Sequence, residues 1–350
     1  MTKTIRLKDV AEAAGVSHGT ASNVFNRPEL VRDEVRERVR EAARALGYAG
    51  PSPAGRLLRS GKVNAIGFAA DQPLDYLFRD PWARRILTEV AEVCDARGAG
   101  LALVSVTEEH PTGWNIESAL VDGFLLSGSG RKFLVEMTQR RGLPFVSLSL
   151  DTRDTDVPAV CIDDFGGAQA AARHLLELGH RRFAVLGFAL GDGPGRVTPR
   201  EVQATRSMNV LERARGYWAA LAEAGIPEAE VPVHAIGRNG GNVGEALALL
   251  FADRATAPTA ILAMADRLAL AAMAWLEGQG LRVPQDVSVV GFDGVPEAAS
   301  STPPLTTMEQ PYRRIAERSV AAILDDAMPE GREVLPLDLV LRASTGPAPS

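Results

Sequence analysis

The sequence is poor in cysteine and aromatic residues, and it has no long apolar run. Its 350 residues include only two cysteines, Cys94 and Cys161, which is too few for a disulfide framework and is typical of a reducing compartment. We predict that both pack as small core side chains. No apolar segment approaches the roughly 18 residues of a spanning helix, and the polar N-terminus lacks the apolar part of a signal peptide. These absences predict a cytoplasmic protein with no membrane contact.

Catalytic and cofactor motifs are also missing. The five histidines show neither the HExxH spacing nor the cysteine partners of a zinc site. The Gly-rich stretches at 128–130 and 191–195 do not precede the Lys-Ser/Thr pair of a P-loop and do not match G-x-G-x-x-G. We therefore predict no enzyme activity, no metal and no cofactor. An enzyme of the doubly wound class is an alternative that turnover of a substrate would reveal.

Charge is distributed unevenly along the chain. The net charge is −6, yet residues 1–62 carry 12 Lys and Arg against 7 Asp and Glu, and the remainder carries 26 against 37. An N-terminal segment of +5 in front of an acidic remainder indicates that contact with a polyanion is confined to that segment. A solvated charged helix would give the same balance, so charge alone does not decide between them.

Three helices are predicted in residues 1–48, which we call the head. Apolar residues at i, i+3, i+4 and i+7 predict a helix over 7–14, which Gly15 can end in the left-handed conformation. A second helix over 17–26 begins with a good N-cap, and a longer third helix follows over 33–46. Two short helices joined by a tight turn are typical of the helix-turn-helix, whose second helix enters the DNA major groove.

The stretch from LKDVAEAAGVSHGTASNVF to LGY resembles the head of the LacI family, with its DVA, AGVS, T-x-S, N-x-P, V-R and LGY landmarks in order. Residues 49–62, which we call the hinge, have the Pro, Gly and basic composition of a linker. The resemblance instead implies a hinge helix that inserts Leu58 into the minor groove, although Gly55 there lowers helix stability by roughly 0.5–1 kcal/mol. The predicted DNA-binding residues are Ser17, His18, Gly19, Thr20, Ser22, Asn23, Asn26, Arg56 and Leu58.

Residues 63–350, the body, alternate strand-like and helix-like segments, which predicts an α/β fold with parallel sheets. The resemblance continues through VDGFLL, R-A-R-G-Y, PTAILAMAD and LVLRAST, and it implies the two-lobed fold of periplasmic sugar-binding proteins. Ligands bind such sheets at the carboxyl ends of the strands, so we expect the effector between the lobes. We place lobe 1 at about 63–163 and 293–324 and lobe 2 at about 164–292 and 325–342, with crossings near Asp163, Phe292 and Asp325.

Candidate effector contacts lie in this predicted cleft. Arg213 opens an R-x-x-G-Y motif that matches a family arginine which binds effector hydroxyls or carboxylates, and Asp293 follows a predicted strand. A structural salt bridge is the alternative for each. Ser149 and Ala265 stand where many members have an acid and an Asn or Ser, so the effector class stays open, with sugars favoured over nucleosides. The predicted set is Asp71, Phe78, Ser149, Arg213, Ile236, Ala265 and Asp293, with Trp82 as a further apolar wall.

These observations predict a repressor that binds double-stranded operator DNA under the control of a small-molecule effector, with induction favoured over corepression. We expect a homodimer, because one small helix-turn-helix covers too few base pairs. A sugar-binding protein of a transport system is a second alternative, but it would need an export signal and would have no use for the head. His180, in the turn LGHRR, is predicted to be structural.

Overall fold

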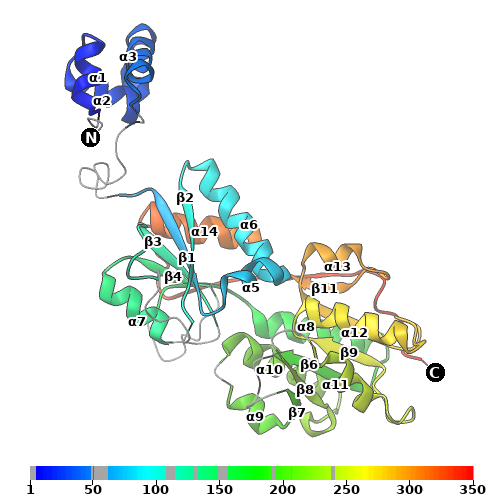
Figure 1. The fold of residues 1–350 in the computed structure, drawn as a ribbon. Helices are drawn as coiled ribbons and strands as arrows, with labels where there is room; N and C mark the ends of the chain where they lie inside the picture. The colour runs from blue at the N-terminus through cyan, green and yellow to red at the C-terminus, as the bar shows by residue number, and fades with distance from the viewer. Residues whose placement is uncertain are drawn as a thin grey trace. The chain divides into compact units, whose positions relative to one another are not determined.

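The computed structural model describes residues 5–48, 50, 62–107, 115–128, 132–148, 157–188, 190, 194–205, 207–237 and 241–349. The chain divides into two compact units, Met1–Val63 and Asn64–Ser350, which contain the head and the body (Figure 1).

The first unit has the three predicted helices and one short 3-10 turn. Gly15 and Gly47 adopt the left-handed conformation, with φ of 64° and 68°, and end the first and third α-helices as expected. The Ser17 hydroxyl accepts a hydrogen bond from the backbone N–H of Thr20 at 3.1 Å, which confirms it as an N-cap. The elements are α1 (Leu7–Ala13), α2 (His18–Asn26), η1 (Pro28–Leu30) and α3 (Asp33–Leu46).

One small apolar core joins these helices. Its fully buried members come from all three α-helices, and they are Val10, Ala11, Ala14, Ala21, Val24, Val39 and Ala43. Because few side chains supply the burial, the caps and turns contribute a large share of the stability of the head.

A six-stranded sheet forms the first lobe of the body, in the order β12-β5-β4-β3-β1-β2 with parallel neighbours. Figure 1 shows α7 on one face of this sheet and the pair α6 and α14 on the other. The strands are β1 (Ala65–Ala70), β2 (Gly100–Ser105), β3 (Gly123–Ser127), β4 (Phe145–Ser147), β5 (Ala159–Ile162) and β12 (Arg332–Leu335). The helices are α5 (Leu74–Arg79), α6 (Pro81–Ala96), α7 (Lys132–Arg141) and α14 (Tyr312–Leu324).

Side chains alternate between the two faces of this sheet. Ile66 and Phe68 of β1 pack in one cluster with α6 and α14, whereas Phe124 and Leu126 of β3 pack in another cluster with α7. Strands covered on both faces read as continuous apolar runs, which is why β1 and β3 were recognisable in the sequence.

A seven-stranded sheet forms the second lobe, in the order β13-β11-β10-β9-β6-β8-β7, with antiparallel pairing of the two edge strands β7 and β13. Its strands are β6 (Phe183–Phe188), β7 (Gly195–Val197), β8 (Val233–Ile236), β9 (Ala260–Ala263), β10 (Ser288–Asp293), β11 (Thr306–Glu309) and β13 (Asp338–Val340). Its helices are α8 (Asp164–Glu177), α9 (Pro199–Gln203), α10 (Met208–Glu223), η2 (Glu228–Glu230), α11 (Val243–Leu250), α12 (Asp266–Gly278) and α13 (Pro296–Ser300).

The chain crosses between the lobes three times, but two crossings differ from the expected ones. The first, at Asp163 between β5 and α8, is where we expected it. The second lies at Gln310 rather than near Phe292, because β11 pairs with β10 in the second sheet. The third lies at Pro336 rather than near Asp325, because β12 returns to pair with β5. Lobe 1 therefore gains 325–335, and lobe 2 gains 293–309.

Candidate functional site

The start of α2 presents the predicted DNA-contacting side chains. Ser17, His18 and Gly19 are exposed, while Thr20 and Asn23 are half-buried. Ala21 and Val24, on the opposite side of the same helix, are fully buried in the head core. The amphipathic pattern of α2 thus leaves its N-terminal turn facing outward, as contact with base edges requires.

Two predicted DNA contacts are already engaged with each other. The Asn26 amide donates to the backbone oxygen of Ser22 at 2.9 Å and to its hydroxyl at 3.1 Å. In the described part of the head, the Asn23 amide has no hydrogen-bond partner, so Asn23 is the better placed of the two amides to meet a base. Arg56 and Leu58 lie outside the described residues.

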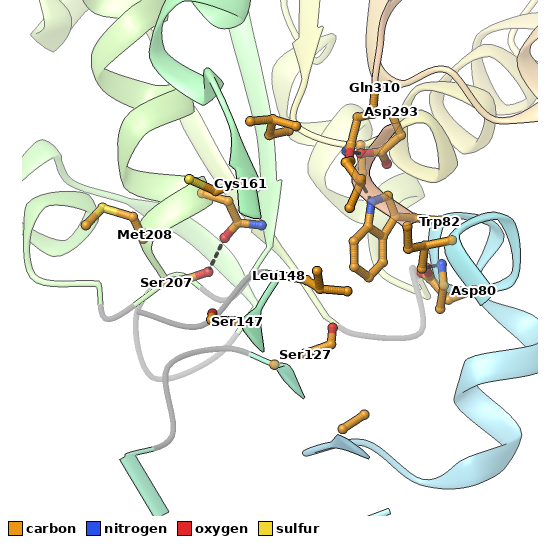
Figure 2. Close-up of a pocket in the computed structure, with 18 of the residues that line it drawn as sticks. Asp80, Trp82, Ser127, Ser147, Leu148, Cys161, Ser207, Met208, Asp293 and Gln310 are labelled. Carbon is orange, nitrogen blue, oxygen red and sulfur yellow. Dashed lines mark hydrogen bonds between the residues drawn. The ribbon is translucent and has the colours of Figure 1, made fainter. Parts of the chain in front are cut away.

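The body contains a cavity between the carboxyl ends of its two sheets, with a volume of about 180 Å³. A single water needs only about 10–15 Å³ on this measure, so the cavity is large enough for a small organic molecule. Figure 2 shows Trp82, Asp80, Asp293 and Gln310 on one side of the cavity and Ser147, Cys161, Ser207 and Met208 on the other. Of the residues predicted to bind the effector, Asp71, Arg213, Ala265 and Asp293 line the cavity, as does Trp82.

Two predicted residues do not line the cavity. Phe78 is 61% exposed, because Leu77 is the residue of α5 that faces the core, and the next side chain is rotated by roughly 100°. Ile236, at the end of β8, is buried against α11 and α12. Ser149 lies outside the described residues.

Arg213 lies at the centre of the polar end of the cavity. It is 3% exposed, and its Nε donates to Asp164 Oδ1 at 2.7 Å. One Nη1 hydrogen bond goes to the backbone oxygen of Met264, and the same nitrogen lies 3.7 Å from Asp293 Oδ1. The guanidinium stacks on the Phe292 ring at 3.7 Å. These contacts fix the plane of the guanidinium, and among the described residues nothing bonds its Nη2.

Asp293 faces Arg213 at the end of β10 and connects the second lobe to the first. Its Oδ1 accepts a hydrogen bond from Gln310 Nε2 at 2.8 Å, and Gln310 Oε1 in turn accepts from Trp82 Nε1 at 3.0 Å. No described residue bonds Asp293 Oδ2. Arg213 and Asp293 both line the cavity and lie 3.7 Å apart through Nη1 and Oδ1, and each keeps one polar atom without a partner among the described residues, which suits a ligand with neighbouring hydroxyl groups.

The backbone at Asp293 is in a strained conformation, with φ of 134°, and Gly294 follows with φ of 75°. Asp266 holds this turn. Its carboxylate, fully buried, accepts hydrogen bonds from the N–H groups of Gly294 at 2.7 Å and Val295 at 2.9 Å and from the Thr307 hydroxyl at 2.5 Å. Asp266 therefore does not touch the cavity but positions the residue that does.

Burial changes the protonation of these carboxyl groups. Burial raises the pKa of Asp164, and Arg213 opposes that shift. Burial raises the pKa of Asp293 well above its usual value, again against Arg213 and with a further upward contribution from Asp266. A ligand hydroxyl both donates and accepts hydrogen bonds, so it can pair with either carboxyl group in either protonation state.

The first turn of α6 contacts the second lobe directly. Asp80 caps α6 by accepting from the Ala83 N–H at 3.0 Å, and its other oxygen lies 3.4 Å from Arg267 Nε of α12. Arg84 forms a second ion pair, with Glu297 of α13. Sequence reasoning missed these pairs, since their partners lie far apart along the chain. It also misjudged Cys161, which lines the cavity, although Cys94 is buried as predicted.

His180 has the structural role predicted for it. It is fully buried, and its ring nitrogens lie 3.0 Å from the hydroxyls of Thr259 and Ser288, with the Gly346 carbonyl at 3.1 Å. Within the described ranges, no three His, Cys, Asp or Glu side chains are grouped to hold a metal ion. Nor is any helix in those ranges both long and apolar enough to cross a membrane.

The two units match two known families. Residues 6–50 match the family described as "Bacterial regulatory proteins, lacI family", and residues 172–345 match the "Periplasmic binding protein-like domain". An HTH-type transcriptional regulator of Mycobacterium tuberculosis is 36% identical over 355 residues, which cover 97% of each chain.

Two solved structures share the fold. The lac repressor dimer bound to operator and the anti-inducer ONPF is 26% identical with a TM-score of 0.77, and the match covers 98% of this chain and 100% of that one. The complex of the transcriptional regulator CelR with cellobiose is 28% identical with a TM-score of 0.66, covering 97% and 99%. With a helix-turn-helix head, a two-lobed body and this similarity from end to end, the chain belongs to the lacI family of DNA-binding bacterial transcriptional regulators.

Proposed function

We propose that this regulator is a repressor whose affinity for operator DNA is controlled by a sugar or sugar derivative bound in the cavity of the body. The observation that carries the proposal is that Arg213 and Asp293, whose Nη1 and Oδ1 lie 3.7 Å apart at the cavity, each keep one polar atom, Nη2 and Oδ2, without a partner among the described residues. Neighbouring hydroxyls of a sugar ring can bind both at once. The lac repressor and CelR structures, solved with ligands of this kind, support the same assignment.

The aromatic lining suits a sugar ring. Trp82 is fixed by its hydrogen bond to Gln310 and presents an apolar ring to the cavity, and the C–H groups of a sugar ring can pack against it. Tyr76 and Phe188 also line the cavity.

Control of DNA binding follows from the contacts that join the lobes. The ion pairs of Asp80 with Arg267 and of Arg84 with Glu297 hold α6 against the second lobe. A ligand that contacts both lobes stabilises one relative arrangement of the lobes over another. If the two arrangements differ in DNA affinity, ligand binding and DNA binding are coupled by about 1–3 kcal/mol. We propose that the coupling is negative, so that the effector induces expression.

We further propose that the protein acts as a homodimer in the bacterial cytoplasm, where its DNA target lies. One recognition helix reads only a few base pairs, and two heads related by two-fold symmetry would read two half-sites. Measurement of the mass in solution tests this point, and a monomer at micromolar concentration would contradict it.

The test of the effector site combines calorimetry with DNA selection. Bound duplexes are first selected from random DNA, and the affinity for the selected duplex is then measured with and without a panel of sugars and nucleosides. We expect a sugar to bind and to weaken DNA binding about 5- to 150-fold. Asp293→Asn should weaken binding of that sugar, whereas its DNA affinity in the absence of the sugar should stay within a few-fold of wild type. Tight binding of nucleosides alone would contradict the sugar assignment.

A further inference from the structure

The first-lobe wall of the cavity crosses five strands, and the residues that form it are offset from one strand to the next by no more than one or two positions. Strand register aligns Ala70 with Ser127, Leu126 with Ser147, Ser147 with Ala159, and Ala159 with Arg332. The wall runs from Asp71, just after β1, through the two serines to Arg332 on β12. Four strand spacings of about 4.8 Å separate its ends, so they stand about 19 Å apart.

Arg332 differs from the other two arginines that line the cavity. Arg213 has Asp164 and Asp293 beside it, and Arg267 has Asp80 at 3.4 Å. For Arg332, no carboxylate of the described residues lies within 4 Å. Its single polar contact is Nη2 to Cys161 Sγ at 3.8 Å, which is a weak interaction.

The carboxylates nearest to Arg332 are already paired. Glu333, its neighbour in sequence, is held by Arg318 through contacts of 2.8 to 3.0 Å. Asp164 is bonded to Arg213. Asp71, at the other end of the wall, lies beyond the roughly 8–10 Å over which charges act in salt solution. Among the described residues, the exposed Arg332 guanidinium therefore has no carboxylate partner.

The second lobe offers further donors at the same end. Figure 2 shows Ser207 and Met208, at the start of α10, on the side of the cavity where Cys161 lies. The Ser207 hydroxyl donates to Asn209 Oδ1 at 2.6 Å and does not cap the helix. The Val210 N–H donates to Asn209 Oδ1 at 3.0 Å, and the start of this 16-residue helix adds partial positive charge on the side of the cavity where Cys161 lies.

We infer that the effector carries an anionic group, a carboxylate or a phosphate ester, that binds Arg332 while its hydroxyls bind Arg213 and Asp293. This inference rests on the proposed function, because it concerns the same cavity. A guanidinium fork suits either anion, and a ligand that supplies the missing negative charge balances this end of the cavity. The effector is then an acidic or phosphorylated sugar rather than a neutral one.

The test uses matched sugars on the full-length protein. Calorimetry compares glucose, glucuronate and glucose 6-phosphate, galactose with galacturonate, and cellobiose with cellobiuronate. We expect at least one acidic compound to bind about tenfold or more tightly than its neutral parent. The two acidic forms of glucose distinguish a carboxylate from a phosphate.

Three variants locate the effect. Arg332→Gln should remove the preference for the acidic compound and leave binding of the neutral parent within about twofold, whereas Arg332→Lys should retain part of it. Arg254→Gln, at an exposed arginine outside the cavity lining, lowers the net charge equally and should change nothing.

Two results would overturn the inference, and they differ in what they mean for the proposed function. Neutral sugars that bind as well as their acids, with no effect of Arg332→Gln, would remove the anionic subsite and leave the sugar effector intact. Failure of every sugar, neutral and acidic, to bind would contradict both the inference and the sugar effector.

Discussion

The functional side chains of the head are exposed on its surface, whereas those of the body are buried. Ser17, His18 and Gly19 are exposed at the start of α2, and the residues that fold the head lie on the other side of the helix. In the body, Arg213 and Asp293 are 3% and 6% exposed, and their hydrogen bonds hold parts of the structure together. Apart from Ser17, which also caps α2, the head separates recognition from folding, and the body combines them.

The difference has a physical origin in what each surface binds. Base edges and phosphates lie outside the protein, so the head must expose its donors to reach them. A small ligand is bound inside the protein, where donors and acceptors must satisfy one another when the ligand is absent. Substitutions of the cavity residues of the body should therefore change both stability and effector response, whereas substitutions of exposed residues of α2 that neither cap the helix nor enter its core should change DNA recognition alone.

The largest effect is expected for Arg213→Ala. Removal of the guanidinium leaves Asp164 and Asp293 buried without their cation, which should lower the free energy of unfolding of the body by roughly 3–5 kcal/mol. Urea titration measures this loss. Response to the effector should also disappear, while DNA affinity without effector stays within a few-fold.

The control for this prediction is an arginine of the surface. Arg173 pairs with Glu223 at 2.9 Å, and both side chains are about half exposed. Arg173→Ala should therefore change stability by less than about 1 kcal/mol. Equal losses for Arg173→Ala and Arg213→Ala would show that burial of the pair does not matter and would break the contrast between head and body.

The next effect concerns Asp266, which supports the site without touching the ligand. Asp266→Ala leaves the N–H groups of Gly294 and Val295 and the Thr307 hydroxyl without their acceptor, at a cost of about 3 kcal/mol in the free energy of unfolding. Because the turn at Asp293 is then free to relax, effector affinity should fall as well. The exposed Asp253→Ala is the matched control. Unchanged effector affinity in folded Asp266→Ala would show that Asp266 has no positioning role.

The fold was largely predictable where elements are long or fully buried. The left-handed glycines at 15 and 47, the N-cap at Ser17 and the buried strands β1, β6 and β10 each carry a local signal. The crossings were not predictable in the same way. Strands β11 and β12 have only four residues each, and the sheet that each joins depends on its pairing partner, which periodicity does not encode.

The site was predictable only where single residues follow a motif or a strand end. Arg213 and Asp293 belong to this class, and both line the cavity. Arg267 and Gln310 lie there because they contact residues of the other lobe, about 190 and 230 positions away. No local pattern indicates such pairs. Phe78 was wrongly placed at the cavity because its face of α5 depends on the start of a six-residue helix, and one residue changes that face.

In the head, Asn23→Ala tests DNA recognition without changing the fold or stability of the head. Asn binds adenine through its N6 and N7, whereas the arginine common at this position in the family binds guanine, and each such contact discriminates by roughly 1–3 kcal/mol. We expect wild type to prefer adenine at one half-site position and the variant to lose that preference, with no change in the urea midpoint of the head.

Binding to a panel of duplexes at one salt concentration measures the preference. The alternative is that Asn23 contacts only phosphate, in which case Asn23→Ala weakens all duplexes alike. Asn26→Ala is a useful comparison, because the Asn26 amide is bonded to Ser22. A preference for adenine that survives in Asn23→Ala would overturn the assignment.

The smallest effect is the pH dependence of the free energy of unfolding of the body, which contains buried histidines. Burial lowers the pKa of His180 below its ordinary value near 6.5, and His174 and His234 are shifted in the same direction for the same reason. Between the lowered pKa and about pH 6.5 the unfolded chain binds more protons than the folded one. The contribution of these histidines should therefore lower the free energy of unfolding of the body as the pH falls from 7 towards 5.

The raised pKa values of Asp164, Asp266 and Asp293 act with the opposite sign, since there the folded state binds the extra proton. The histidine contribution is therefore measured by plotting the free energy of unfolding against pH and comparing the slope for wild type with the slope for His180→Gln. At most about 1.4 kcal/mol per pH unit is expected for one histidine, and the slope against pH should be smaller in the variant whatever its absolute stability. Identical slopes would show that His180 does not take up a proton on unfolding, and the pH response of the body would then have to come from its other buried groups.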